Sequence, residues 1–254
     1  MKKAAFIMTL SLIIVLTLTG CDIVNLFVNT VIGSGELVVE EREVTSFSKI
    51  DASGNLELYV TKSNTGIEVN AESNLMKYIH TFVEGETLFV EIADTDGGSI
   101  NLQPLEPIQV FVEFTKITDV SLHGGVQMES KELVAEEMQI NINMSGGSTA
   151  KIDAILTENL NMTLSGGSNL NVTEGKVTNQ IIKASGGSEY MADWVQSVVT
   201  ELIFSGGSEG TIWAEETLEL ALSGGSIVYY YGSPNNLDEI RSSGGSDYIS
   251  KGER

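Results

Sequence analysis

The chain contains very few of the residues that bind metals or form covalent cross-links. Among its 254 residues, only Cys21 is a cysteine and only His80 and His123 are histidines. A single cysteine cannot form a disulfide within the chain, and a zinc site needs clustered His or Cys ligands, which this sequence lacks. We therefore expect a fold held together by packing alone, with no metal and no cofactor.

Basic residues are also scarce. Lys and Arg number 14 against 35 Asp and Glu, so the formal net charge is −21. Binding of nucleic acid depends on Lys and Arg side chains that neutralise phosphates, so this charge balance argues against nucleic acid as a partner. An acidic surface keeps an exposed protein soluble, and this is the interpretation of the charge that we favour.

The sequence shows no catalytic constellation. A nucleophile needs a neighbouring base, the G-x-S-x-G motif is missing, and His123 stands at a serine position of a repeated motif. Pairs of carboxylates could hydrolyse glycosides, but nearly all of them fall where we expect turns. We predict that the protein is not an enzyme, and a polysaccharide-active enzyme is the remote alternative. The acidic candidates are Glu40–Glu41, Asp94 with Asp96, Glu136–Glu137, Glu215–Glu216 and Asp238–Glu239.

The N-terminal hydrophobic run is too short for a membrane-spanning helix, which needs about 20 apolar residues. It extends from Phe6 to Leu18, is interrupted by Thr and Ser, and follows two lysines, a layout typical of an export signal. The run ends in Leu18-Thr19-Gly20-Cys21, which resembles the bacterial lipobox. We predict that residues 1–20 are a signal peptide that is removed, and that lipid attached to Cys21 tethers the protein to a membrane.

A lipid on Cys21 would place the protein in the cell envelope, on the extracytoplasmic side of a membrane. Asp22 resembles the signal that retains lipoproteins at the inner membrane of some Gram-negative bacteria, whereas a Gram-positive cell has only one membrane. The choice between inner and outer membrane therefore stays open. Removing residues 1–20 takes away two Lys and no acid, which changes the net charge to 12 − 35 = −23.

A repeat dominates the second half of the chain. The motif Ser-Gly-Gly-Ser recurs with spacings of 20, 20, 20, 18 and 20 residues, and a degenerate copy at Leu122-His123-Gly124-Gly125 precedes the first motif by 22 residues. Self-similarity at such a period is the signature of a repeat architecture. The six motifs occupy residues 145–148, 165–168, 185–188, 205–208, 223–226 and 243–246.

Between these motifs, apolar residues alternate with a period of two, which predicts strands. Each unit reads as a strand, a Gly-Gly corner, a second strand and a polar turn such as residues 173–176. One unit cannot bury its apolar side alone, so the units must stack. We predict an all-β fold, a β-helix or solenoid with coils of about 20 residues over residues 122–250. Its handedness stays open.

Stacking explains why glycine recurs at the corners. Glycine accepts a positive φ or a close approach of the neighbouring coil, and the flanking serines can bond to the corner backbone. The alternative, a calcium-binding Gly-rich repeat, has a period of nine and acidic ligands, and only the last motif here is followed by an Asp, Asp247. The predicted corner residues are Gly146, Gly147, Gly166, Gly167, Gly186, Gly187, Gly206, Gly207, Gly224, Gly225, Gly244 and Gly245.

The region before the repeat is β in pattern but irregular. We predict that residues 46–121 form leading β coils, continuous with the solenoid as one domain, that cover an edge which would otherwise invite pairing between chains. Residues 74–82 fit either a helical turn or a strand. Residues 21–45 are expected to be a spacer between membrane and fold, in which a change such as Gly33→Val should cost little stability.

Three aromatic residues near the C-terminal end form the candidate binding site. When the coils are aligned on their motifs, Trp213 neighbours Tyr231 and Thr211 neighbours Tyr229, and both columns face outward if Tyr230 faces inward. Exposed aromatic rings on adjacent strands make a flat platform against which sugars can stack. The alternative is that Trp213 and Tyr231 are buried, or serve only as cross-strand pairs of the sheet.

The sequence also resembles the head GIN domain family, the adhesin-like proteins associated with autotransporters. The resemblance rests on Ile32-Gly33-Ser34-Gly35, on Phe47 with Ile50, on the Ser-Gly-Gly corners and on Tyr230-Tyr231-Gly232-Ser233-Pro234. It covers the chain from about Gly33 to Ile249 and implies a β-helix. The corners here read Ser-Gly-Gly where Ser-Gly-Ser-Gly is expected for the family.

Two functional hypotheses follow from these patterns. The favoured one is a non-catalytic, membrane-tethered envelope lipoprotein whose solenoid binds a glycan, a matrix component or a surface protein. The rival is a structural or sensory envelope component that binds no external ligand. An aromatic or charged groove would favour the first, and a uniformly polar surface the second. The sequence does not identify the ligand or the oligomeric state.

Overall fold

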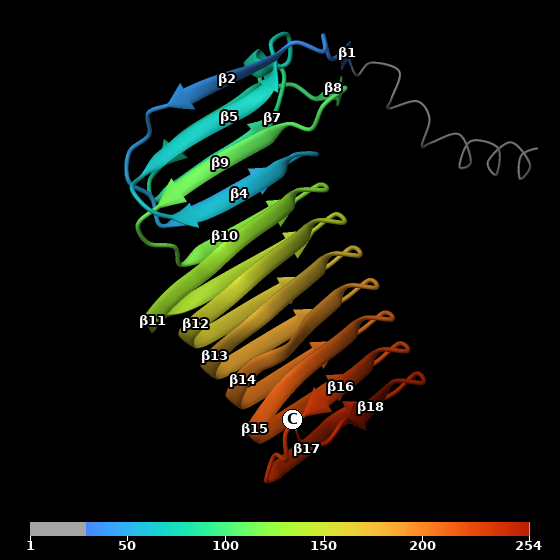
Figure 1. Cartoon of the computed structure of the whole chain (residues 1–254). Coiled ribbons are helices and arrows are strands. Elements are labelled where there is room, and N and C mark those ends of the chain that lie inside the picture. Colours follow the sequence, from blue (N-terminus) through green and yellow to red (C-terminus); the bar gives the residue numbers. More distant parts are fainter. Residues whose placement is uncertain (1–28, 254) are drawn as a thin grey trace, which may run out of the picture.

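The computed structural model describes residues 29–253 and consists of strands that stack along one axis (Figure 1). Five long strands form successive coils, and each pairs in parallel with the next, so that Thr149, Asn169, Glu189 and Glu209 lie side by side. The predicted all-β solenoid with coils about 20 residues apart is confirmed. The long strands are β11 (Gln127–Ser145), β12 (Thr149–Leu164), β13 (Asn169–Ala184), β14 (Glu189–Phe204) and β15 (Glu209–Leu222).

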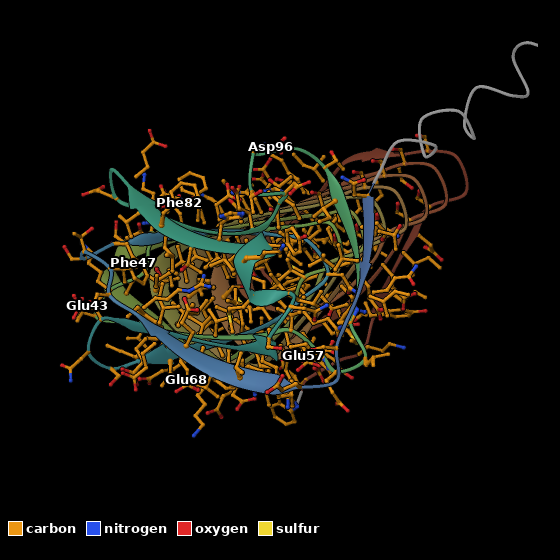
Figure 2. All side chains as sticks on the ribbon, turned by 90° about the horizontal axis from the view of Figure 1, so that it is seen from above. Glu43, Phe47, Glu57, Glu68, Phe82 and Asp96 are labelled. Atoms are coloured by element: carbon orange, nitrogen blue, oxygen red, sulfur yellow. The ribbon has the colours of Figure 1, made fainter. Side chains whose placement is uncertain are left out.

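In each coil, one set of side chains points inward and is buried. Viewed along the stack, these side chains fill the enclosed space (Figure 2). Along a coil, every second residue points inward, except at two places where the next inward residue comes three positions later. These two places divide the coil into three straight segments. The predicted polar turn at residues 173–176 is instead part of β13, because Glu174, Gly175 and Lys176 pair with residues 154–156 of β12. In β12 the inward residues are Ala150, Ile152, Ile155, Thr157, Leu160, Met162 and Leu164.

The Ser-Gly-Gly-Ser motifs lie at the turns between successive coils. All twelve glycines of the six motifs have positive φ, between 65° and 79°. A Cβ on Gly186 would lie 3.2 Å from the backbone nitrogen of Gly166 in the preceding coil. In the first five motifs the closing serine is buried and donates a hydrogen bond to the carbonyl of the opening serine, as Ser188 does to Ser185 at 2.8 Å. The motif thus closes each coil and sets how tightly the coils stack.

The leading region has a mixed topology. Parallel pairing continues from β11 to β4 and β10 and on to β9, β3 and β7, whereas β2 with β5, β5 with β9, and β6 with β7 are antiparallel. Residues 74–82, left open by the sequence, contain a 3-10 turn, Met76–Tyr78, and the start of β6. The strands are β2 (Leu37–Arg42), β3 (Lys49–Ser53), β4 (Glu57–Lys62), β5 (Gly66–Glu72), β6 (Ile79–Glu84), β7 (Thr87–Ile92), β9 (Gln109–Phe114) and β10 (Asp119–His123).

Part of the expected spacer belongs to the fold. β1 (Asn29–Ile32) pairs with β8 (Ile100–Gln103), and β2 pairs along its whole length with β5. The fully buried carboxylate of Glu72 accepts hydrogen bonds from the backbone N–H groups of Gly35 (2.5 Å) and Leu105 (2.8 Å). A Cβ on Gly33 would overlap this carboxylate, so the expected tolerance of Gly33→Val is wrong. Residues 29–42 have only a weak apolar pattern, and hydrogen bonds to Glu72 and backbone pairing hold them in the fold.

The predicted signal peptide, residues 1–20, and the predicted lipid-attachment residue, Cys21, lie outside the described residues. Within the part of the chain that the structure describes, no helix has the length and apolar character needed to cross a membrane. At the other end, the solenoid finishes with three short strands, of which β16 and β17 pair with β15, and β18 pairs with β16. These strands are β16 (Ile227–Tyr231), β17 (Asn236–Ser242) and β18 (Asp247–Ser250).

Candidate functional site

The predicted aromatic residues lie side by side on the last coils. Trp213 of β15 is the register partner of Tyr231 of β16, and Thr211 is the partner of Tyr229. Trp213, Tyr229 and Tyr231 are half-buried, and Tyr230 between them packs against the core. The three rings therefore sit at the surface on adjacent strands, with only part of each ring accessible.

Trp194 adds a fourth ring that the sequence analysis did not identify. Trp194 is 54% exposed, compared with 41% for Phe82 at the other end of the molecule. Its ring centroid lies 6.2 Å from that of Trp213, with 54° between the two ring planes. We call the group formed by Trp194, Trp213, Tyr229 and Tyr231 the aromatic ridge.

A shortened coil brings Trp194 to the ridge. Trp194 comes six residues after its motif and Trp213 five residues after the next one, so counting along a regular repeat does not align them. The coil of β15 is two residues shorter than its neighbours, and the β14–β15 pairing passes directly from Met191 to Gln196, which is the partner of Trp213. The corner of β14 that carries Trp194 thus lies beside Trp213. The 18-residue spacing was the only signal of this in the sequence.

A buried polar cluster supports the irregular pairing from inside. The hydroxyl of Ser197 donates to the backbone carbonyl of Trp213 at 2.7 Å, and the side-chain amide of Gln180 donates to Ser197 (2.8 Å) and to Thr200 (2.9 Å). The pairing of β14 with β15 shifts register between Ser197 and Val199, so these side chains provide hydrogen bonds where the strand ladder is interrupted. They hold the backbone of Trp213 in place.

Lys251 covers part of the ridge. Its ammonium nitrogen lies 4.2 Å from the ring centroid of Tyr229, a distance at which a cation is attracted to the face of the ring. One face of Tyr229 is thus in contact with this side chain. Trp194, Trp213 and Tyr231 make the more continuous part of the ridge.

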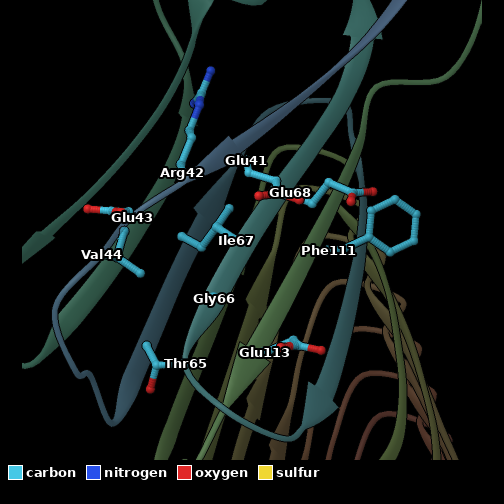
Figure 3. A pocket seen from close by; sticks show the side chains of 10 residues that line it. All are labelled: Glu41, Arg42, Glu43, Val44, Thr65, Gly66, Ile67, Glu68, Phe111 and Glu113. Atoms are coloured by element: carbon cyan, nitrogen blue, oxygen red, sulfur yellow. The ribbon is translucent and has the colours of Figure 1, made fainter.

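A second surface feature lies at the opposite end of the molecule. A hollow of about 780 Å³ is bordered by β2, β5 and β9 and lined by four glutamates, Arg42 and Phe111 (Figure 3). The guanidinium of Arg42 is engaged elsewhere, because it donates to Glu40 (2.8 Å) and to the carbonyl of Ile79 (2.7 Å). Of the acidic pairs considered from sequence, only Glu41 contributes to this hollow. The four glutamates are Glu41, Glu43, Glu68 and Glu113.

Among the described side chains, the other acidic candidates do not line this hollow, and the side chains of Glu136, Glu137 and Glu239 lie outside the described part of the structure. Asp94 and Asp96 sit in one tight turn, where their carboxylates accept hydrogen bonds from the backbone N–H groups of Thr95 and Gly98. Glu215 and Glu216 are exposed side chains of β15. Within residues 29–253, leaving out the undescribed side chains of residues 136–138 and 239–241, no three His, Cys, Asp or Glu side chains are grouped so that they could hold a metal ion.

His123 occupies a serine position of the corner column. It is the register partner of Ser53 and Ser145, and its Nδ1 lies 2.8 Å from the Ser145 hydroxyl. Its Nε2 lies 3.8 Å from Asp51, which is longer than a hydrogen bond. A serine protease-type triad requires that the carboxylate orient the imidazole by a hydrogen bond, so these three side chains do not form one.

Solved structures of three bacterial proteins have the same fold. A putative adhesin from Bacteroides fragilis aligns with a TM-score of 0.76 and 20% identity, covering 88% of this chain and 98% of that one. A putative adhesin from Parabacteroides merdae aligns with a TM-score of 0.69 and 17% identity, covering 87% and 99%. A protein described as a putative lipid binding protein, from Parabacteroides distasonis, aligns with a TM-score of 0.70 and 18% identity, covering 87% and 100%.

These identities establish a common fold. No curated protein matches the sequence significantly. The family model described as "Putative auto-transporter adhesin, head GIN domain" matches residues 46–234, which include five of the six Ser-Gly-Gly-Ser motifs, the buried polar cluster and the aromatic ridge. The chain therefore belongs to the head GIN domain family of adhesin-like proteins.

Proposed function

We propose that this protein is a non-catalytic envelope lipoprotein that attaches to a surface partner through its aromatic ridge. The observation that carries the proposal is the gathering of Trp194, Trp213 and Tyr231 on one stretch of surface. Large exposed aromatic rings are costly to leave in water, and they are enriched at binding sites because each offers a wide rigid contact with one polar tip.

The position of the ridge supports this role. β1, which begins eight residues after Cys21 in the sequence, lies at one end of the stack, and β16 lies near the other end (Figure 1). Parallel strands are about 4.8 Å apart, so the intervening coils separate the ridge from the tethered end. A membrane-tethered binder needs its contact surface away from its own membrane, and this arrangement meets that need.

The relatives point in the same direction. The family and two of the structural neighbours are described as adhesins. The net charge of −21 suits an exposed protein that must remain soluble. A glycan, a matrix component and a surface protein each remain partners that the ridge could bind.

The test is attachment of cells that carry the full chain to host matrix or to neighbouring cells. We expect the double change Trp213→Ala and Tyr231→Ala to reduce attachment at least several-fold. The matched control is Phe82→Ala, because Phe82 is an exposed aromatic, 41% accessible, that stacks on Phe89 at the opposite end. Equal attachment by the double variant and the control variant would contradict the proposal and favour the structural or sensory role.

The tether is tested separately. Cells that produce the chain with Cys21→Ala should incorporate no palmitate analogue into this protein, whereas the unchanged chain should be labelled. Equal labelling of both would exclude Cys21 as the lipid-attachment residue while leaving the role of the ridge intact.

A further inference from the structure

A hollow of about 660 Å³ lies next to the aromatic ridge, on β12, β13 and β14. Leu156, Lys176 and Gln196 are register partners on these three strands and form one row of its lining, and Gln196 is in turn the partner of Trp213. Trp194 forms a side of the hollow. The hollow and the ridge are therefore one continuous strip that crosses five strands, from Leu156 to Tyr231.

Gly175 shapes this hollow. A Cβ at this position would overlap the carbonyl oxygen of Ile155, so the backbone of β13 approaches β12 more closely here than any other residue would allow. Gly175 is itself part of the lining. The register partners of Gly175 are Ile155 and Val195, both fully buried, so the glycine interrupts a column of large side chains.

The lining combines apolar side chains with hydrogen-bond donors and acceptors. The indole of Trp194 is 54% exposed and the side chain of Leu156 is 37% exposed. Around them stand donors and acceptors, namely the ammonium of Lys176, the carboxylate of Glu174, the amide of Gln196 and the hydroxyl of Thr173. Apolar surface with a few placed polar groups is the usual composition of a small-molecule site.

A pyranose ring matches this composition. One face of the ring carries C–H groups that pack against an indole, while its hydroxyls donate and accept hydrogen bonds at the edge. The strip continues beyond the hollow to Trp213, whose ring centroid is 6.2 Å from that of Trp194, and then to Tyr231. At about 4.8 Å per strand, the strip is about 19 Å long, which suits several sugar units in a chain.

We infer that this strip is a glycan-binding site for an uncharged oligosaccharide, and that the hollow beside Trp194 holds one pyranose unit. The inference rests on the proposed function and specifies its ligand class. The charges favour a neutral ligand, because Glu174 and Lys176 balance each other within the hollow while the whole chain carries −21. A polyanionic glycan would be repelled by the rest of the molecule.

The test uses the full chain, with cellohexaose, maltohexaose and chitohexaose as neutral probes and a galacturonic acid hexamer as the acidic probe. We expect at least one neutral probe to bind and to change the tryptophan fluorescence. Trp194→Ala should raise its Kd about tenfold, which corresponds to about 1.4 kcal/mol of lost aromatic contact. Phe82→Ala, the exposed aromatic far from the strip, should leave the Kd unchanged.

The outcomes separate this inference from the proposed function. Absence of binding by all neutral probes, with attachment of cells still lost in the Trp213→Ala and Tyr231→Ala variant, would overturn the glycan assignment and leave the proposed function standing. Tighter binding of the acidic hexamer would overturn the neutral ligand class. Binding that is lost in the double variant but unchanged by Trp194→Ala would remove the hollow from the site. Gln196→Ala provides a second change in the same hollow and should also weaken binding.

Discussion

Tyr190 illustrates the effect of a polar atom placed deep in the solenoid. The side chain is fully buried, and its hydroxyl has no hydrogen-bond partner among the described residues. Burial holds the pKa of Tyr190 far above its ordinary value of 10.0, because the phenolate cannot be solvated there. A buried hydroxyl without a partner costs about 1–3 kcal/mol. At this position the ring contributes to stability and the hydroxyl opposes it.

We expect Tyr190→Phe to raise the free energy of unfolding by about 1 kcal/mol at neutral pH, measured by urea denaturation. A folded-state pKa above the unfolded value means that stability is fully present below pH 10 and falls as pH rises beyond it. The phenylalanine variant should therefore lose less stability between pH 9 and pH 11. Tyr230→Phe, at a half-buried site, serves as the control. A destabilised Tyr190→Phe would show that the hydroxyl is satisfied in solution.

The two glycines of one corner differ in what surrounds them. Gly186 and Gly187 have similar positive φ, 68° and 74°. A Cβ on Gly186 would lie 3.2 Å from the nitrogen of Gly166, whereas a Cβ on Gly187 would meet nothing within 4 Å. The pair therefore separates backbone strain from crowding between coils.

Gly187→Ala should cost about 1–2 kcal/mol, the strain of a positive φ alone. Gly186→Ala should cost about 1–3 kcal/mol more, because the neighbouring coil must also move. The midpoints of chemical denaturation measure both. Equal midpoints for the two variants would mean that the stack absorbs the crowding without cost.

At the scale of elements, Glu72 joins the N-terminal strands to the rest of the fold. Its carboxylate accepts the N–H groups of Gly35 and Leu105, which lie in the connections before β2 and after β8. In Glu72→Gln, one carboxylate oxygen is replaced by an NH₂ donor, so one of these N–H groups loses its acceptor. The loss should be about 1–3 kcal/mol.

Hydrogen exchange localises this effect. Amides of β1 and β2 should exchange faster in Glu72→Gln, whereas amides of β12 to β14 should keep their protection, because pairing in the repeat does not involve Glu72. Uniformly faster exchange over all strands would show that the N-terminal strands and the repeat unfold as one unit.

For the whole molecule, we predict that divalent cations do not contribute to stability. The corners are closed by glycine backbone and by serine hydroxyls that bond to the chain, as in Ser168 to Ser165 at 2.8 Å. A chelator should therefore leave the melting temperature unchanged, as measured by calorimetry. A drop of several degrees would indicate bound calcium, since a ligand that binds only the folded state raises its melting temperature.

The sequence by itself determined the all-β solenoid, its period and its corners. These features come from local rules: alternation sends Ile152 inward, and positive φ selects glycine at positions such as Gly186. Because the same local rules act in every coil, they produce a repeated pattern that can be recognised in the sequence without a structure. The register of Trp213 with Tyr231 followed from the same alignment on the motifs.

The tertiary structure alone decided how the coils fit together where the repeat is shortened. Trp194 lies at the ridge only because β15 is two residues short and its pairing with β14 skips a corner, which depends on how two coils fit together. Glu72 and Gly35 are 37 residues apart, and no local sequence pattern indicates that the buried carboxylate of Glu72 accepts a hydrogen bond from the N–H group of Gly35. Such contacts arise from packing between segments that are distant in the sequence. They are the reason why part of the expected spacer forms strands and why a hollow lies beside the exposed indole of Trp194.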